Sequence, residues 1–195
     1  MKIFSTIIDD LAEHGWSVTP NLVSGQLIED LLNEQNQLFE SGKFKKAGIG
    51  RESGKVINSE IRGDEIIWFD DENLLPAQKE YSDLMTVFRH QINLEFYLGL
   101  TEFECHFAKY PVGSFYKRHL DQFKNSGSRL ISCILYLNKN WANDDEGFLR
   151  LYLENETLDV FPEAGTFVCF KSEEIEHEVF PTKRERNSVT GWMRK

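Results

Sequence analysis

The chain has 195 residues, of which 41% are hydrophobic and 28% are charged. These ordinary values exclude a disordered or collagen-like chain. Its formal net charge of −10 repels phosphate backbones, so we expect no nucleic-acid partner. No segment reaches the ~20 apolar residues that cross a bilayer. Asp9 and Asp10 interrupt the apolar N-terminal stretch before it reaches signal-peptide length, so we expect no membrane partner and a cytoplasmic location.

The first half of the chain shows helical patterning without internal repeats or linker-like tracts. Ser24 can cap a helix whose apolar residues recur at helical spacing and which should end near residues 41–42. A second amphipathic helix is predicted from about Pro76 to Leu94. We therefore predict one domain over residues 1–195, with a helical support region over 1–100 and a strand-rich core over 101–195.

A polar segment separates the two predicted helices. Residues 47–71 begin Gly-rich and end in a short strand-like stretch from Glu65 to Phe69. This pattern favours a hairpin or flap, and mobile loops of this kind often cover active sites. A plain surface loop is the alternative interpretation.

Short strands dominate from Phe103 onward. They are rich in β-branched and aromatic residues and are separated by turn-forming residues. The predicted strands are Phe103–Tyr110, Arg129–Asn138, Phe148–Leu153, Gly165–Lys171, Ile175–Phe180 and Asn187–Met193. Closely spaced strands after helices predict an α+β fold, in which a sandwich or jelly roll carries helices on one side.

The three cysteines lie in these strand-like runs. Cys105, Cys133 and Cys169 are far apart in sequence and form no Cys-x-x-Cys pair. We expect buried free thiols, and a redox pair between strands is the alternative.

One short segment carries two residues that can bind a metal. On an extended backbone, His119 and Asp121 project to the same side because they lie two residues apart. His177, in a later strand-like stretch, supplies a third candidate ligand. Two histidines and a carboxylate leave open positions of the kind that iron(II) oxygenases need. Zinc hydrolases can use the same three residue types, so this pattern alone leaves the metal open.

A basic residue follows His177 closely. We expect a turn at residues 182–185 to fold the two stretches into a hairpin, with Arg186, Thr190 and Trp192 on one face of the second strand. A buried guanidinium needs an anionic partner, and a dicarboxylate cosubstrate would supply one. Thr190 and Tyr136 could donate further hydrogen bonds. A solvated charge in the basic turn is the alternative for Arg186.

Several motifs resemble one enzyme family in the right order. The segments YPVGSFYKRHLD, ILYLNKNW, GFLRLY, PEAGTFVCF and HEVFPTKRERNSVTGW resemble the iron(II) and 2-oxoglutarate oxygenase domain of prolyl hydroxylases. The similarity is greatest to the hypoxia-sensing branch and its bacterial relatives, and IRGDEIIWFDD resembles a segment that precedes the core in that branch. The resemblance covers roughly residues 45–195.

The resemblance implies a double-stranded β-helix, the jelly-roll fold of these enzymes. It implies iron(II) on His119, Asp121 and His177, with ascorbate as a reductant. It implies 2-oxoglutarate on Arg186, with Tyr110, Tyr136 and Thr190 lining its pocket. Positions that match the substrate side are Arg62, Asp64, Tyr116, Arg129 and Trp192.

The function implied is hydroxylation of a prolyl residue in a protein, with dioxygen as the oxidant. In bacterial relatives the implied substrate is elongation factor Tu. The same chemistry on a small molecule or a free amino acid is one alternative, and a non-catalytic jelly-roll metal sensor is another. Nucleic-acid demethylation is disfavoured by the acidic charge.

Overall fold

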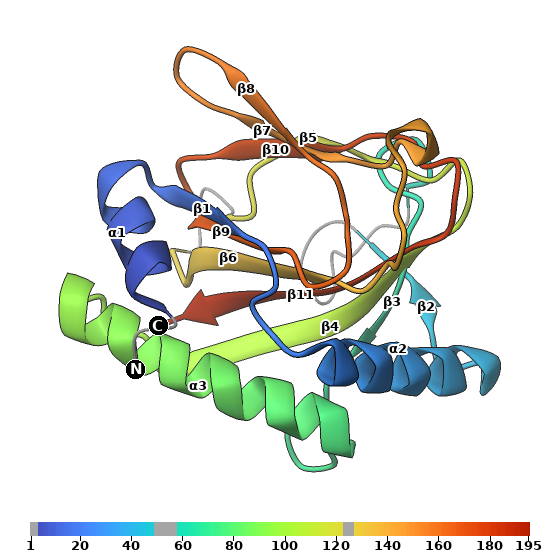
Figure 1. Ribbon diagram of the computed structural model, residues 1–195, viewed down its shortest axis with the longest axis horizontal. Coiled ribbons are helices and arrows are strands. Elements are labelled where there is room, and N and C mark those ends of the chain that lie inside the picture. Colours follow the sequence, from blue (N-terminus) through green and yellow to red (C-terminus); the bar gives the residue numbers. More distant parts are fainter. Residues whose placement is uncertain (1–3, 49–57, 123–126) are drawn as a thin grey trace.

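Two antiparallel sheets face each other in the computed structural model, which describes residues 4–48, 58–122 and 127–195 (Figure 1). The seven-stranded sheet has the order β1-β9-β6-β11-β4-β3-β2, and the four-stranded sheet has the order β5-β10-β7-β8. The larger sheet comprises β1 (Trp16–Thr19), β2 (Lys45–Lys46), β3 (Glu65–Trp68), β4 (Glu102–Tyr110), β6 (Arg129–Tyr136), β9 (Phe167–Lys171) and β11 (Arg186–Arg194). The smaller sheet comprises β5 (Tyr116–His119), β7 (Leu149–Tyr152), β8 (Thr157–Val160) and β10 (Glu176–Val179).

Three helices cover the large sheet on the side away from the small one: α1 (Ser5–Glu13), α2 (Gly25–Glu40) and α3 (Pro76–Phe96) (Figure 1). The Ser24 hydroxyl caps α2 by accepting a hydrogen bond from the Leu27 amide at 3.1 Å. Both predicted helices are confirmed, and α3 runs two residues beyond Leu94. Within the described residues, no helix is long and apolar enough to span a membrane.

The alternation of side chains along the strands divides the interior into two layers. On β6, Cys133 and Leu135 point into the layer beneath the helices, whereas Ile134 and Tyr136 point into the layer between the sheets. All three cysteines are buried free thiols, as predicted. The layer between the sheets is the one that opens onto the cavity described below, because Ile134 lines both.

The connection between β10 and β11 corrects one prediction. The turn after residue 181 does not form a hairpin, because β10 pairs with β5 and β7 while β11 pairs with β4 and β6. The chain instead crosses from one sheet to the other, as the jelly-roll arrangement requires. The histidine strand and the arginine strand therefore approach the interior from opposite sheets.

The predicted flap is described only in part, because residues 49–57 lie outside the described ranges. Its second half is ordered as predicted: Glu65–Trp68 forms β3, which pairs with β4. Just before β3, Arg62 forms a bridge with Tyr116, so this segment joins the small sheet to the large one.

Candidate active site

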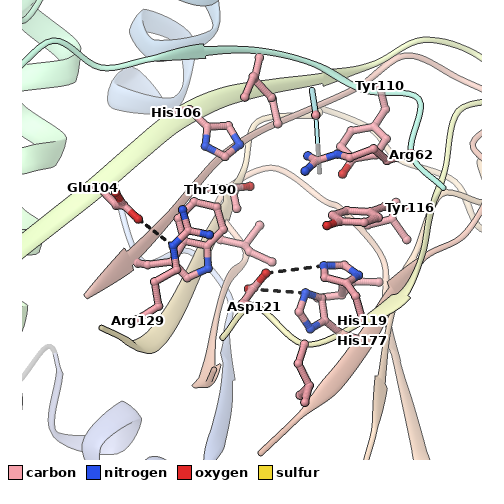
Figure 2. A pocket seen from close by; sticks show the side chains of 18 of the residues that line it. Arg62, Glu104, His106, Tyr110, Tyr116, His119, Asp121, Arg129, His177 and Thr190 are labelled. Carbon is pink, nitrogen blue, oxygen red and sulfur yellow. Dashed lines mark hydrogen bonds and ion pairs between the residues drawn. The ribbon is translucent and has the colours of Figure 1, made fainter. Parts of the chain in front are cut away.

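A cavity of about 770 Å³ lies at one end of the space between the sheets. Figure 2 shows side chains from both sheets pointing into it. Its apolar walls include Ile66, Ile134, Leu149 and Val179. All three predicted metal ligands line it, as do Arg186 and Thr190. The volume falls in the range of small-molecule sites.

His119, Asp121 and His177 converge although His177 follows Asp121 by 56 positions in the sequence. His119 ends β5, Asp121 follows in the adjoining bend, and His177 lies on β10, where it pairs in register with His119. One potential ligand atom from each residue lies within 4.8 Å of the other two. The Nε2 atom of each histidine is 3.5 Å from a different Asp121 oxygen. Within the described residues, this is the cluster that could hold a metal ion.

The second nitrogen of each imidazole meets a backbone carbonyl. His119 Nδ1 lies 2.7 Å from the Lys117 carbonyl oxygen, and His177 Nδ1 lies 3.2 Å from that of Ile175. A proton on Nδ1 can be donated there, which leaves the Nε2 lone pair facing the centre of the triad. The tautomers that these contacts favour are the ones that coordinate a metal through Nε2.

Burial and charge set the protonation of the triad. Burial alone would raise the pKa of Asp121, but the two histidines and a 2.7 Å hydrogen bond from Ser132 lower it well below its usual range. Burial, reinforced by His119, lowers the pKa of His177 from 6.5 to about 4. An ionised carboxylate and a neutral His177 at neutral pH are the forms that bind a metal cation.

The stability of the metal-free protein should therefore fall with acidity. Between pH 6.5 and about 4, His177 takes up a proton in the unfolded chain but not in the folded one. Unfolding free energy should decrease by on the order of 3 kcal/mol across this window. Urea unfolding at pH 7 and pH 5, with the metal chelated, measures the effect. His177→Gln should show a smaller pH dependence, and equal slopes for the two proteins would contradict the assignment.

Arg186 begins β11 and is among the largest fully buried side chains of the described residues, at 1% exposure. Its Nε donates a 2.9 Å hydrogen bond to the Gly147 carbonyl, whereas its Nη2 has no hydrogen-bond partner within the described residues. Those residues also place no carboxylate within ion-pair distance of it. A buried guanidinium without an anion is costly, so the arrangement fits an anionic ligand such as a carboxylate.

Two tyrosines flank this guanidinium. The ring centroids of Tyr110 and Tyr136 both lie 4.9 Å from the Arg186 Cζ atom. The Tyr136 hydroxyl is buried, and burial raises its pKa against the opposing influence of Arg186, so it stays a donor. Thr190 shares the face of Arg186, as the strand alternation predicted. The predicted anion-site residues therefore do lie together.

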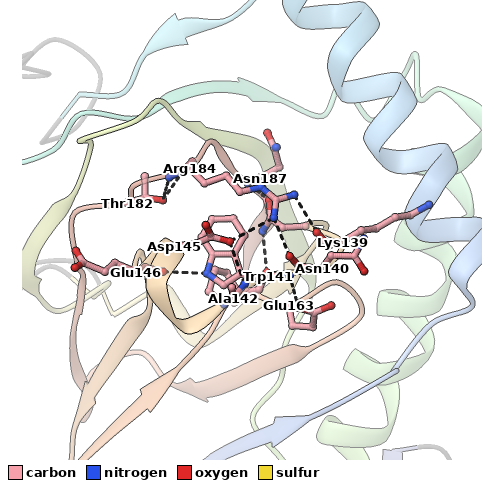
Figure 3. A network of polar contacts seen from close by, with 12 residues as sticks. Lys139, Asn140, Trp141, Ala142, Asp145, Glu146, Glu163, Thr182, Arg184 and Asn187 are labelled. Atoms are coloured by element: carbon pink, nitrogen blue, oxygen red, sulfur yellow. Dashed lines mark hydrogen bonds and ion pairs between the residues drawn. The ribbon is translucent and has the colours of Figure 1, made fainter.

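A set of contacts, here called the collar, holds the Gly147 carbonyl that orients Arg186. Figure 3 shows the part of the collar formed by Arg184, Trp141 and Glu146. The Arg184 Cζ atom lies 5.2 Å from the Trp141 ring centroid. The same guanidinium donates hydrogen bonds to the backbone carbonyls of Lys139 and Asn140, at 2.9 and 3.0 Å. The Trp141 indole donates to the Glu146 carbonyl at 3.0 Å. Gly147 then donates to the Pro181 carbonyl at 3.2 Å, which fixes its own carbonyl toward Arg186.

Gly147→Ala should damage the anion site through this collar. Gly147 has φ +64, and an added Cβ would lie 2.7 Å from Thr182 Oγ1. We expect a loss of about 2–4 kcal/mol in unfolding free energy. Displacement of the Gly147 carbonyl should also weaken 2-oxoglutarate binding by about 10-fold. Calorimetric titration of the metal-loaded protein measures the binding.

The matched control is Gly42→Ala, at φ +72 with nothing within 4 Å of an added Cβ. It carries the same backbone strain far from the cavity, so 2-oxoglutarate affinity should stay unchanged. Equal affinity losses in both variants would show that the effect is general destabilisation.

Four of the five predicted substrate-side residues line the cavity: Arg62, Tyr116, Arg129 and Trp192. Asp64 does not, because its side chain is fully buried and its carboxylate holds Arg62 in a two-point ion pair at 2.5 and 2.7 Å.

Several lining residues were not predicted, among them Trp68 and Glu104. Glu104 accepts a 2.7 Å hydrogen bond from Arg129, whose guanidinium lies 3.6 Å from the Trp192 ring centroid. Strand alternation could have found Glu104, because it has the same parity as His106 and Tyr110 on β4. His106 also lines the cavity.

Solved structures of prolyl hydroxylases share this architecture. A Pseudomonas putida prolyl-4-hydroxylase superposes with a TM-score of 0.92 at 40% identity, covering 100% of both chains. A Trichoplax adhaerens prolyl hydroxylase, solved with a hypoxia-inducible-factor peptide, superposes with a TM-score of 0.88 at 28% identity, covering 99% of this chain and 89% of the other.

Sequence comparisons agree. A profile of the 2OG-Fe(II) oxygenase superfamily, enzymes that use iron(II) and 2-oxoglutarate, matches residues 105–194. Human prolyl hydroxylase EGLN3 is 29% identical over 95% of this chain and 81% of its own length. Mouse Egl nine homolog 1 is 28% identical over 95% of this chain, which spans only 48% of that relative. The chain belongs to the 2OG-Fe(II) oxygenase superfamily and is homologous to the EGLN prolyl hydroxylases.

Proposed function

We propose that the chain hydroxylates a prolyl residue of a protein substrate, with iron(II) held by His119, Asp121 and His177. The observation that carries the proposal is the buried, anion-free Arg186 beside a triad of metal-ligand type. Arg186 would hold the distal carboxylate of 2-oxoglutarate, with Tyr110, Tyr136 and Thr190 around it. Bound iron(II) and 2-oxoglutarate supply the oxidation: one atom of dioxygen enters the substrate C–H bond, the other enters succinate, and carbon dioxide leaves.

The protein's own contribution is position and exclusion of water. The Arg186 guanidinium and the triad approach the cavity from opposite sheets, so a dicarboxylate held at one end presents its other end to the metal. The apolar walls around Ile134 and Val179 keep this part of the cavity dry. The positioning of the dicarboxylate and the exclusion of water restrict the oxidation to a substrate that covers the open side of the cavity.

The open side of the cavity suits an extended peptide. It is lined by the half-exposed Trp68 ring and by the guanidinium groups of Arg62 and Arg129, which pair with Asp64 and Glu104. Aromatic faces can pack against a proline ring, and guanidinium groups can donate to peptide carbonyls. Asp64 would act indirectly, by holding Arg62. The similarity to the Trichoplax adhaerens enzyme, solved with a peptide, supports the same class of substrate.

Succinate release separates the substrate classes. The iron-loaded protein would be assayed with proline-containing peptides, with purified elongation factor Tu, and with free proline and related metabolites, using Asp121→Asn as the inactive control. Mass spectrometry should find one added oxygen atom on a proline of a protein or peptide. Turnover of metabolites alone would favour a small-molecule hydroxylase, and no turnover with any substrate would favour a non-catalytic metal sensor.

A further inference from the structure

One metal-type ligand is covered by an aromatic ring. The Tyr116 ring lies parallel to the His119 imidazole, with centroids 3.6 Å apart and 16° between the planes. The other ring contacts of the triad are tilted, at 57° for both His119–His177 and Phe170–His177. Figure 2 shows Tyr116 directly above His119. His119 is thus held face to face by Tyr116.

A cation covers the opposite face of the same tyrosine. The Arg62 Cζ atom lies 4.1 Å from the Tyr116 ring centroid. Arg62 is fixed in turn by Asp64, and the two side chains are 13% and 0% exposed. Burial opposes the charge on Arg62, but the hydrogen bonds and charge of Asp64 raise its pKa overall, so it stays a cation. Arg62, Tyr116 and His119 therefore form three consecutive layers, and Asp64 pairs with the first of them.

Backbone contacts also join the segment that carries Arg62 to the strand that carries Tyr116. Arg62 and Tyr116 form an antiparallel bridge. Hydrogen bonds lie on both sides of that bridge, from Lys117 N to Ile61 O at 2.9 Å and from Gly63 N to Phe115 O at 3.0 Å. The segment thus extends the small sheet beyond its edge strand β5, four residues long, which ends at His119. The support for this ligand comes from a distant part of the sequence.

We propose that the Asp64–Arg62–Tyr116 stack positions His119 and couples metal affinity to the segment that carries Arg62. The proposal rests on the metal site proposed above. Both faces of a tyrosine ring are electron-rich, so each face attracts an electron-poor partner. One face meets the guanidinium, and the other meets an imidazole that loses electron density when it binds a cation. The stack is therefore stronger with metal bound, and this difference raises metal affinity.

Cobalt(II) titration of the metal-free protein, followed by visible absorption, tests the stack without turnover. Tyr116→Leu should weaken Co(II) binding by about 10-fold, in the range for groups that orient metal ligands. Tyr116→Phe keeps the ring and should bind Co(II) like the wild type. If Tyr116 instead acts only on the substrate, through its hydroxyl, Co(II) binding should be unchanged in both variants. Arg62→Met should show a smaller loss in the same direction.

The matched control is Tyr152→Leu. Tyr152 also lies under an arginine, with Arg118 Cζ at 3.9 Å from its ring centroid, but it does not touch the triad. Its loss should leave Co(II) affinity unchanged. Equal affinities in Tyr116→Leu and Tyr152→Leu would overturn the stack while leaving the metal site intact.

Different results would refute the proposed metal site itself. Wild-type protein that binds no Co(II), or an Asp121→Asn variant that binds as tightly as the wild type, would refute the site itself. If Tyr116→Leu loses its thermal unfolding transition, Arg62→Met decides, because the tyrosine remains in place. Unchanged Co(II) affinity in that variant would overturn the coupling.

Discussion

Replacement of Asp121 by asparagine is expected to abolish turnover. Asp121 supplies the anionic donor of the triad, and each of its oxygens lies 3.5 Å from one histidine Nε2. Groups that merely orient a metal ligand cost about 10–100-fold when removed, so loss of a direct ligand should cost on the order of 1,000-fold or more. Succinate release with a saturating substrate measures turnover, and Co(II) titration separates loss of metal from loss of chemistry.

Two further variants sharpen this prediction. Ser132→Ala leaves Asp121 in place but removes the 2.7 Å hydrogen bond to its Oδ2, so it should cost only about 10-fold in metal affinity. Asp159→Asn removes a carboxylate that pairs with Arg150 on the surface, and turnover should be unchanged. Normal succinate release from Asp121→Asn would exclude the proposed triad.

Local patterns predicted most of the elements because each contains its own physical determinant. The Ser24 hydroxyl marks the start of α2, and the spacing of Tyr81, Met85 and Phe88 marks the buried side of α3. Strand alternation placed Arg186 and Thr190 on the cavity side of β11, because the period of two holds along an extended strand.

Elements with weak periodicity escaped prediction. Helix α1 has only nine residues, and β1 and β8 each bury only one of their residues, so their sequences show no clear alternation. The hairpin predicted between β10 and β11 failed for a different reason. Sequence proximity favours pairing of neighbouring strands, but here tertiary packing assigns each strand to a different sheet.

The candidate site was also predicted only where the local sequence carries the signal. The triad was predicted because His119 and Asp121 share one side of an extended segment and because the motifs around them and His177 resemble a family that holds iron there. The stack on His119 was not, because nothing in the local sequence brings Arg62 against Tyr116; that contact depends on the segment before β3 joining the edge of the small sheet. The collar around Gly147 likewise joins residues from two separate loops, the one between β6 and β7 and the one between β10 and β11.

Arg186 is the second position where a large effect is expected, and its effects on binding and on folding should have opposite signs. Arg186→Met removes the charge-assisted hydrogen bonds proposed for the distal carboxylate of 2-oxoglutarate. A loss of about 3 kcal/mol, or on the order of 100-fold in the Michaelis constant for 2-oxoglutarate, should follow. The turnover number at saturation should change much less, because the triad is untouched.

The metal-free protein should respond to the same substitution in the other direction. Arg186 is buried without an anion within the described residues, so an apolar side chain of similar length should leave stability unchanged or raise it. Urea unfolding measures this, and Arg150→Met, which breaks a half-exposed ion pair with Asp159, is the control for loss of an arginine. An unchanged Michaelis constant for Arg186→Met would contradict the anion site. A large loss of stability would instead show that the guanidinium is structural, because the fold would then depend on a charge that has no anion of its own.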